Sequence, residues 1–488
     1  MANLFRMLRF RRPLAVAGAA LALTVTAVPL AHAGSDYSDP AYLQHDLDNM
    51  SRSTASGRQL AYLTDVDYDA AFTPAAAESF LTNLGKQVAD LPQGRVYGTL
   101  GQVLPGGSVG DPTAYHELTP TTVGFLSRTG AKLLGRVWTD GKAGAHPAIV
   151  ITPGSIQGTQ HMYWWAARTL AEHGYLVLTF DAQGQGESET FGHAPGDPVP
   201  TQDGFPFQQE GNFVDGTVDA LRFLYSTTAA PYVPGGWTAA QVAAAKAAGD
   251  GTLAWANPLQ GSLDRTRLGL AGHSLGARAI SVVQQCSSSS TLWKTLALCT
   301  GRSFPIKAVV AWDKLSADGV VPVVPAMDQQ ADGYFLNPQP TQTAPDPASH
   351  LGPLQAWKAK GLDTYALTVR GGTHIEWVDV PYILPSTTYG NRLADHYTLD
   401  WFQRYLSPSA STRAAAATDL LAAPKTVKGA AAQLPWRADF LSARFRGAFS
   451  FHDAAGILRA TGDLRAYGGA SKVGDWPGAN ADQPTVAP

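Results

Sequence analysis

The strongest candidate for a catalytic residue is a serine that lies between two glycines, in the stretch "GLAGHSLGARAI" (Gly269–Ile280). The apolar residues before Ser274 predict a buried strand, and the residues after it predict a helix. A Gly-x-Ser-x-Gly turn between a strand and a helix exposes the serine hydroxyl and points the helix N-terminus at it. Ser274 is therefore predicted to be a nucleophile rather than an ordinary serine in a Gly-rich connection.

A serine nucleophile needs a base to take its proton. Four histidines follow Ser274 in the chain: His350, His374, His396 and His452. Parallel sheets bind ligands outside the carboxyl ends of their strands, so the base should follow a strand. Only His374 does so, directly after the predicted strand Thr364–Arg370, where Gly371-Gly372 lets the chain turn back. His374 is the predicted base.

The base needs an acid that orients it and stabilises its charged form. The interval between Ser274 and His374 contains six aspartates and no glutamate. Three of them lie beyond the carboxyl end of a predicted strand: Asp313, Asp328 and Asp332. Asp332 ranks first because the acid is expected in a short turn after the penultimate core strand. Asp313 ranks second and Asp328 third, and all three stay open here.

Acyl transfer also requires donors for the negative charge that develops on the carbonyl oxygen. One predicted donor is the backbone N–H of Leu275, next to the nucleophile. The second is the backbone N–H of Ser155, in the loop "ITPGSIQG" (Ile151–Gly158) that follows an earlier strand. The aromatic residues after this loop, from Tyr163 to Trp165, are predicted to be core rather than a substrate platform.

The elements that must position these residues alternate between two kinds of pattern. The predicted buried strands are Pro147–Thr152, Tyr175–Phe180, Arg267–Gly272, Lys307–Trp312, Val321–Met327 and Thr364–Arg370. Helical patterns separate most of them, and the amphipathic segment Arg392–Leu406 closes the series. A hairpin pattern over Val123–Trp138 precedes them. This alternation predicts an α/β fold with a doubly wound, mostly parallel sheet.

The ends of the chain differ from this central region. Arginines precede the apolar run Leu14–Val28, and Ala31-His32-Ala33 resembles a cleavage site, so residues 1–33 are predicted to be a secretory signal peptide. The run is short for a membrane anchor, and no second run is long enough to span a bilayer. We therefore expect an exported protein with an N-terminal extension (34–120), a catalytic domain (121–406) and a C-terminal extension (407–488). Residues 227–264 interrupt the catalytic domain with Pro, Gly and Trp and are expected to form a lid or cap.

The composition of the chain limits the classes of partner that the protein is expected to bind. The chain has 488 residues, a formal net charge of −3 and no basic run outside its N-terminus, which argues against nucleic acid as a partner. Its two cysteines, Cys286 and Cys299, are predicted to pair in an oxidising compartment. Neither has the spacing of a zinc ligand, so no metal site is expected.

Four motifs occur in one order that resembles the α/β-hydrolase superfamily, over about Phe125 to Leu406. They are "TPGSIQG", "DAQGQGES" (Asp181–Ser188), "GHSLG" and "GGTHIEW". The resemblance implies an oxyanion loop, a structural turn in which Asp181 is not catalytic, a nucleophile elbow and the catalytic histidine. Within the superfamily the chain looks most like secreted serine esterases, lipases and dienelactone-hydrolase or polyester-hydrolase relatives. The insertion, the Pro-rich loop after Asp332 and the long extensions depart from the family pattern.

These observations predict a secreted serine hydrolase that cleaves a small or polymeric carboxylic ester through an acyl-enzyme, without metal or organic cofactor. The alternative is a secreted peptidase or amidase with the same triad, in which His374 must protonate a poorer leaving group. A third hypothesis is a non-catalytic binding or scaffold protein that kept the fold. The intact set of serine, aspartate and histidine argues against that third hypothesis.

Overall fold

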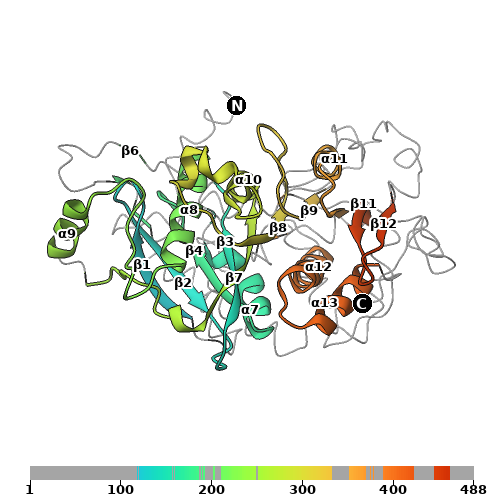
Figure 1. Cartoon of the computed structure of the whole chain (residues 1–488), viewed down its shortest axis with the longest axis horizontal. Helices are drawn as coiled ribbons and strands as arrows, with labels where there is room; N and C mark the ends of the chain where they lie inside the picture. The colour runs from blue at the N-terminus through green and yellow to red at the C-terminus, as the bar shows by residue number, and fades with distance from the viewer. Residues whose placement is uncertain are drawn as a thin grey trace, which may run out of the picture.

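A computed structural model describes most of residues 118–421, together with residues 445–461 (Figure 1). The gaps inside the first range are 119, 156–157, 159, 186–187, 190, 193–201, 204–209, 249–250, 332–350, 370–373, 375–376 and 379–387. The predicted signal peptide, nearly all of the N-terminal extension and Asp332 therefore lie outside the described residues.

The centre of the structure is a mixed sheet of ten strands. They are β1 (Thr121–Leu126), β2 (Lys132–Trp138), β3 (His146–Thr152), β4 (Leu176–Phe180), β7 (Leu263–His273), β8 (Ile306–Trp312), β9 (Ala326–Ala331), β10 (Thr364–Val369), β11 (Phe445–His452) and β12 (Leu458–Thr461). Their order across the sheet is β1-β2-β4-β3-β7-β8-β9-β10-β11-β12. The strands from β4 to β10 in this order pair in parallel. The two strands at each end, β1 and β2 on one side and β11 and β12 on the other, pair antiparallel with their neighbours. The short strands β5 (Phe191–Gly192) and β6 (Gln202–Asp203) pair separately.

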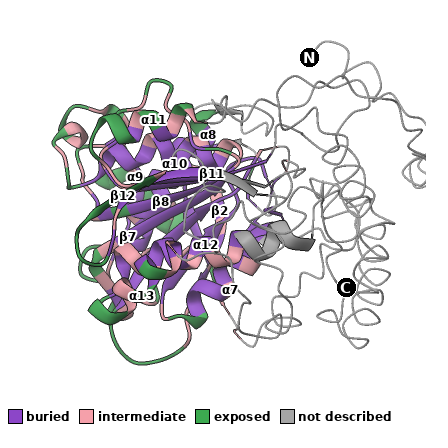
Figure 2. Ribbon diagram, turned by 90° about the vertical axis from the view of Figure 1, so that its right-hand side faces the viewer, coloured by how far each residue is buried: buried purple, intermediate pink, exposed green. Residues whose placement is uncertain are grey.

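Helices cover both faces of this sheet, as Figure 2 shows. One face carries α8 (Glu210–Leu224), α10 (Leu275–Val283) and α11 (Gly352–Ala359), and the other carries α7 (Trp164–Glu172), α12 (Thr388–Leu406) and α13 (Ala410–Leu420). Alternate residues of a strand serve the two cores: Ile149 and Ile151 of β3 belong to one apolar cluster, and Ala148 and Val150 to the other. The predicted α/β class, with a mostly parallel sheet, is confirmed.

The strand predicted at Val321–Met327 is displaced, because β9 runs from Ala326 to Ala331. Its sequence is "AMDQQA", and the polar side chains of Asp328, Gln329 and Gln330 are fully buried. A buried strand normally reads as an apolar run, so these three polar residues moved the prediction to the wrong segment. The error matters because the ranking of the acids depended on where this strand ends.

The insertion at 227–264 packs beside the hairpin formed by β1 and β2. It contains α9 (Ala239–Ala248), which Figure 1 shows at the outer side of β1. The Tyr232 hydroxyl donates to the carbonyl of Leu126 at 2.5 Å, and the Trp237 indole donates to the carbonyl of Arg128 at 2.9 Å. Three strands separate β1 from β7, the strand that precedes Ser274. The insertion therefore packs at the edge of the sheet and not beside Ser274.

The C-terminal extension contributes to the same sheet. Helix α13 packs on α12, and the hairpin of β11 and β12 continues the sheet beyond β10. The pattern "FRGAFSFHDAAGILRA" thus forms the hairpin that its alternation indicates. No helix among the described residues is long and apolar enough to cross a membrane.

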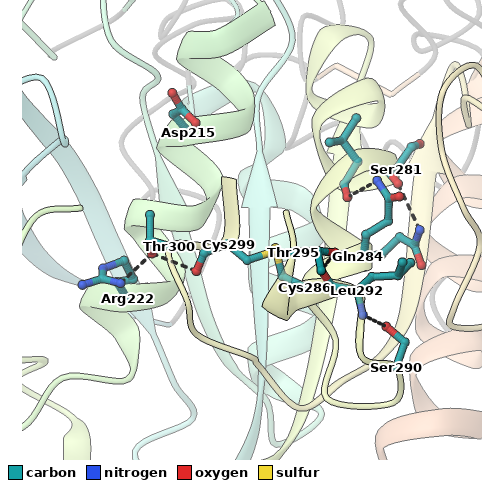
Figure 3. Close-up of a disulfide and its surroundings, with 12 residues drawn as sticks. Asp215, Arg222, Ser281, Gln284, Cys286, Ser290, Leu292, Thr295, Cys299 and Thr300 are labelled. Carbon is teal, nitrogen blue, oxygen red and sulfur yellow. Dashed lines mark hydrogen bonds between the residues drawn. A yellow bond between two sulfur atoms is a disulfide. The ribbon is translucent and has the colours of Figure 1, made fainter. Parts of the chain in front are cut away.

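The two cysteines form a disulfide, as predicted (Figure 3). Cys286 ends the short helix η5 (Gln284–Cys286) that continues α10, and Cys299 ends η7 (Ala297–Cys299). Their Cα atoms are 5.5 Å apart, and both residues are fully buried. Closing so short a loop stabilises a fold by about 3 kcal/mol in the chain-entropy model. The bond therefore anchors the far end of the helix that begins at Ser274.

Candidate active site

Ser274 occupies the turn between β7 and α10 in a conformation that few non-glycine residues adopt. Its φ is 54° and its ψ is −119°, while β7 ends at His273 and α10 begins at Leu275. The N–H of Ser274 donates to the carbonyl of Trp312 at 2.9 Å, which ties the turn to the end of the neighbouring β8. Such positive-φ strain in a non-glycine residue is kept where the surrounding structure enforces it, and it clusters at functional sites.

The two glycines that flank Ser274 are required by close backbone contacts. A Cβ on Gly276 would overlap the carbonyl oxygens of Thr152 and Pro153, at the end of β3. A Cβ on Gly272 would overlap the carbonyl of Gly276 itself. The Gly-x-Ser-x-Gly spacing therefore indicates a turn in which the strand, the helix and the neighbouring loop lie so close that no side chain fits at the two glycine positions.

The loop predicted to hold the oxyanion lies against this turn. A Cβ placed on Gly154 would lie 3.2 Å from the Cβ of Ser274, so Gly154 borders the serine side chain directly. The side-chain amide of Gln185 donates to the carbonyls of Gly154 at 2.9 Å and of Gly158 at 3.0 Å, which holds the loop from behind. The amides of Ser155 and Leu275 thus belong to segments that border Ser274 on two sides.

The turn "DAQGQGES" supports the same loop, and Asp181 within it is fully buried. Its carboxylate accepts hydrogen bonds from the backbone N–H of Gln160 at 2.7 Å and from the side-chain amide of Gln160 at 3.3 Å. The Ser188 hydroxyl donates to the carbonyl of Asp181 at 2.7 Å. Both carboxylate oxygens of Asp181 therefore bind Gln160, a residue just after the loop.

His374 is paired with an aspartate across the end of the sheet. Its Nδ1 lies 2.5 Å from Oδ2 of Asp313, the residue that directly follows β8. A carboxylate can only accept, so Nδ1 carries the proton of the neutral ring and Nε2 is its basic nitrogen. Of the two candidate acids that the structure describes, Asp313 is thus the one that contacts His374.

The other two candidates have different positions. Asp328 lies inside β9, where its Oδ1 accepts from the N–H of Leu315 at 2.8 Å and its Oδ2 from the side chain of Gln330. Asp332 lies outside the described residues. Between the two candidates that the structure describes, Asp313 is therefore preferred to Asp328.

Asp313 and Asp328 differ in burial and in charge: the side chain of Asp313 is 15% exposed, whereas Asp328 is fully buried. Burial alone would raise the pKa of Asp313, but the hydrogen bond and charge of His374 and the N–H of Ala331, 3.1 Å from Oδ1, bring that pKa below its usual value. Burial raises the pKa of Asp328 to about 7, and the nearby charge of Asp313 adds to the rise. A carboxyl that must stabilise an imidazolium has to be ionised, and this requirement is met at Asp313.

A chain of hydrogen bonds connects the oxyanion loop to the backbone of the histidine. The N–H of Gly154 donates to the Tyr163 hydroxyl at 3.0 Å, which lies 2.8 Å from Nδ1 of His273. Nε2 of His273 lies 2.8 Å from the carbonyl oxygen of His374, and the two rings have centroids 4.7 Å apart. The base is therefore adjacent to the residue that precedes Ser274.

The aromatic residues behind the loop form a packed wall. Tyr163 and Trp164 are almost fully buried, which confirms that they are core. Tyr163 stacks on Trp312 with centroids 6.1 Å apart, and Trp165 contacts Trp312 at 5.2 Å. These aromatic rings belong to the apolar cluster on the α7 side of the sheet.

Comparisons with known proteins add no family assignment. No protein-family model matches the chain, and a search of curated proteins finds no match. The functional conclusion therefore depends on the geometry of the site.

One group among the described residues has the ligand types to hold a metal ion, and it lies on the C-terminal helices. Nε2 of His396 is 3.2 Å from a carboxylate oxygen of Asp400 and 3.0 Å from one of Asp419. Both distances are those of ion pairs, which form when the histidine is protonated. The group stands on α12 and α13 and not on the elements that carry Ser274, His374 or Asp313.

Two participants at the site do not follow from motif spacing, namely His273 and the hydroxyl of Tyr163. His273 occupies the variable position of Gly-x-Ser-x-Gly, and its only sequence signal is a polar residue at the end of a buried strand. Tyr163 reads as one more aromatic core residue. Their contact joins positions 110 residues apart and depends on tertiary structure.

Proposed function

We propose that the protein is a secreted serine hydrolase of the α/β-hydrolase type that cleaves carboxylic esters through Ser274, His374 and Asp313. One observation carries the proposal. A serine in a strained strand-to-helix turn lies beside a histidine pair whose second ring, that of His374, is held at Nδ1 by a half-buried, ionised aspartate. A nucleophile, a base and an acid that orients the base are the parts that acyl transfer by serine needs.

In the first step Nε2 of His374 takes the proton of the Ser274 hydroxyl as the serine oxygen attacks the ester carbonyl. Asp313 keeps the ring in the tautomer that presents Nε2 and stabilises the imidazolium once it forms. The same Nε2–H then protonates the departing alkoxide, and the C–O bond of the ester breaks. The acyl group is left on the serine oxygen.

The charge that develops on the carbonyl oxygen is placed beside backbone amides. Leu275 is the first residue of α10, so its N–H is one of the unsatisfied donors at the positive end of the helix. Ser155 follows Gly154, which borders Ser274 on the other side. We assign these two N–H groups as the oxyanion donors, each expected to supply a rate factor of about 10²–10³.

In the second step His374 activates water, which attacks the acyl-enzyme and releases the acid and the free serine. Every proton in this cycle passes through Nε2 of His374, and every step uses groups of this chain.

Export is part of the proposal. A basic segment followed by the apolar run Leu14–Val28 has the layout of a signal peptide. The Cys286–Cys299 disulfide supports it, because such bonds persist mainly in oxidising compartments.

Hydrolysis of short p-nitrophenyl esters by wild type and Ser274→Ala tests the proposal. We expect the variant to lose about 10⁴–10⁶-fold in kcat, since removing a nucleophilic serine has effects of this size. Ser288→Ala is the matched control, because Ser288 is exposed beyond the end of α10. Equal activity in wild type and Ser274→Ala would refute the proposal, and matched p-nitroanilides would measure any preference for amides.

A further inference from the structure

We propose that His273 and Tyr163 are positioning residues, which hold the oxyanion loop and the catalytic histidine in one hydrogen-bonded chain. The inference rests on the proposed function and adds two residues to it. The variable residue before the nucleophile gains a defined role, because its ring donates a hydrogen bond to the backbone of the base.

The direction of the chain follows from the groups at its ends. The carbonyl of His374 can only accept, so the Nε2 of His273, at 2.8 Å, must carry a proton. The neutral His273 ring then has a lone pair on Nδ1, which accepts from the Tyr163 hydroxyl at 2.8 Å. The phenolic oxygen in turn accepts from the N–H of Gly154 at 3.0 Å. Every donor meets one acceptor, and only one tautomer of His273 satisfies all three contacts.

The two side chains of the chain are shielded from water. Tyr163 is 1% exposed and His273 is 4% exposed. Burial raises the pKa of the Tyr163 hydroxyl above its usual range, so it remains a donor. Burial, together with the charge of His374, lowers the pKa of His273 to about 3. His273 therefore stays neutral while His374 gains and loses its proton 4.7 Å away.

This neutrality has a consequence for catalysis. A second positive charge at that separation would disfavour the imidazolium that His374 must form. A neutral ring that donates to the backbone of His374 instead fixes the position of the base without adding charge. The same chain fixes Gly154, whose neighbour Ser155 supplies a proposed oxyanion donor. The hydrogen-bonded chain thereby fixes the positions of both the loop and the base relative to Ser274.

The side chain of His273 also packs in a way that an apolar ring can imitate. It contacts the ring of Tyr163 at 5.7 Å and that of Trp377 at 6.3 Å between centroids. His273→Phe keeps an aromatic ring there and removes both hydrogen bonds. His273→Gln retains an amide N–H at the reach of Nε2 and can still donate to the carbonyl of His374. Tyr163→Phe removes the hydroxyl alone.

The test measures kcat and KM on p-nitrophenyl acetate for these variants, with Ser274→Ala assayed beside them. We expect His273→Phe to lose about 10–100-fold in kcat with KM within about threefold, because small displacements of catalytic groups have effects of this order. His273→Gln should recover most of that loss. Tyr163→Phe should lose about tenfold, and the double variant with Phe at both positions should lose less than the product of the single losses.

A folded His273→Phe with wild-type kcat would overturn the inference, and so would equal losses in the Phe and Gln variants. If His273→Phe does not fold, Tyr163→Phe decides: a tenfold loss of kcat supports the chain, and an unchanged kcat overturns it. Activity that survives in Ser274→Ala would instead refute the proposed function, so the two failures are distinguishable.

Discussion

The proposed nucleophile and the proposed base–acid pair are built in different ways. The turn around Ser274 is made by five consecutive residues, Gly272 to Gly276, and its geometry is dictated by backbone atoms that almost touch. The pair of His374 and Asp313 joins positions 61 residues apart, and its geometry depends on where two strands end. The first region leaves a local signature in the sequence. The second leaves only a set of aspartates that each follow a strand.

This difference explains why the sequence proposes a single nucleophile but leaves three candidates for the acid. Close packing of backbone excludes every side chain, so glycine is obligatory and the motif is visible directly. A carboxylate that faces a histidine needs no special neighbours in the chain, so several aspartates meet the criterion. Substitutions confined to one region at a time test this contrast.

The largest expected effect comes from the acid. Asp313→Asn should lower kcat by about 10³–10⁴-fold, because the amide cannot stabilise the imidazolium and favours the wrong tautomer of His374. Asp332→Asn should stay within a few-fold of wild type. Steady-state hydrolysis of a p-nitrophenyl ester by both variants measures this. A larger loss in Asp332→Asn than in Asp313→Asn would return the role to the aspartate that the sequence ranked first.

The next effect concerns the turn itself. Gly276→Ala should destabilise the fold by about 3 kcal/mol or more and abolish activity, since the new Cβ meets the carbonyls of Thr152 and Pro153. Urea unfolding with activity assays measures both. Gly211→Ala is the control: it lies at the start of α8, a Cβ there meets nothing within 4 Å, and its stability should be equal or higher. A fully active, stable Gly276→Ala would contradict the steric account of the motif.

The third effect is on the pH dependence of stability rather than on catalysis. The folded-state pKa of Asp328, raised to about 7 by burial, exceeds its value of about 3.8 in the unfolded chain. Between these values the folded state binds more protons, so this residue makes stability fall as pH rises, by at most about 1.4 kcal/mol per pH unit. Asp328→Asn removes the dependence.

The measurement is urea unfolding of wild type and Asp328→Asn from pH 4 to pH 8. The stability of the variant relative to wild type should increase between pH 4 and pH 7 and then level off. A difference that is the same at all pH values would mean that the charge state of Asp328 does not change over this range, and would contradict the raised pKa.

Much of the fold was predictable because it is carried by apolar periodicity. Strands such as β3 and β4 are continuous apolar runs, and the amphipathic segment predicted at Arg392–Leu406 lies within α12 and ends at the same residue. The strand β9 was misplaced because Asp328, Gln329 and Gln330 are buried through hydrogen bonds, which periodicity does not register. Burial of polar groups depends on partners elsewhere in the chain.

The residues of the candidate site also fall into those that the sequence predicts and those that it does not. Ser274, the loop at Gly154 and His374 follow from motifs at the ends of strands. The choice of Asp313, and the chain from Tyr163 through His273, depend on contacts between distant segments, for which one sequence holds no spacing rule. Residues whose roles arise from local sterics can be read from the chain, and those whose roles arise from tertiary contact need the structure.

The most direct test of the central claim is labelling with a fluorophosphonate, which reacts with a serine that an adjacent base has activated. Folded wild-type protein should carry one adduct, located by peptide mass spectrometry on Ser274, and His374→Ala should lose it. An adduct on another serine, or no adduct on folded wild type, would contradict the assignment of Ser274 as the nucleophile.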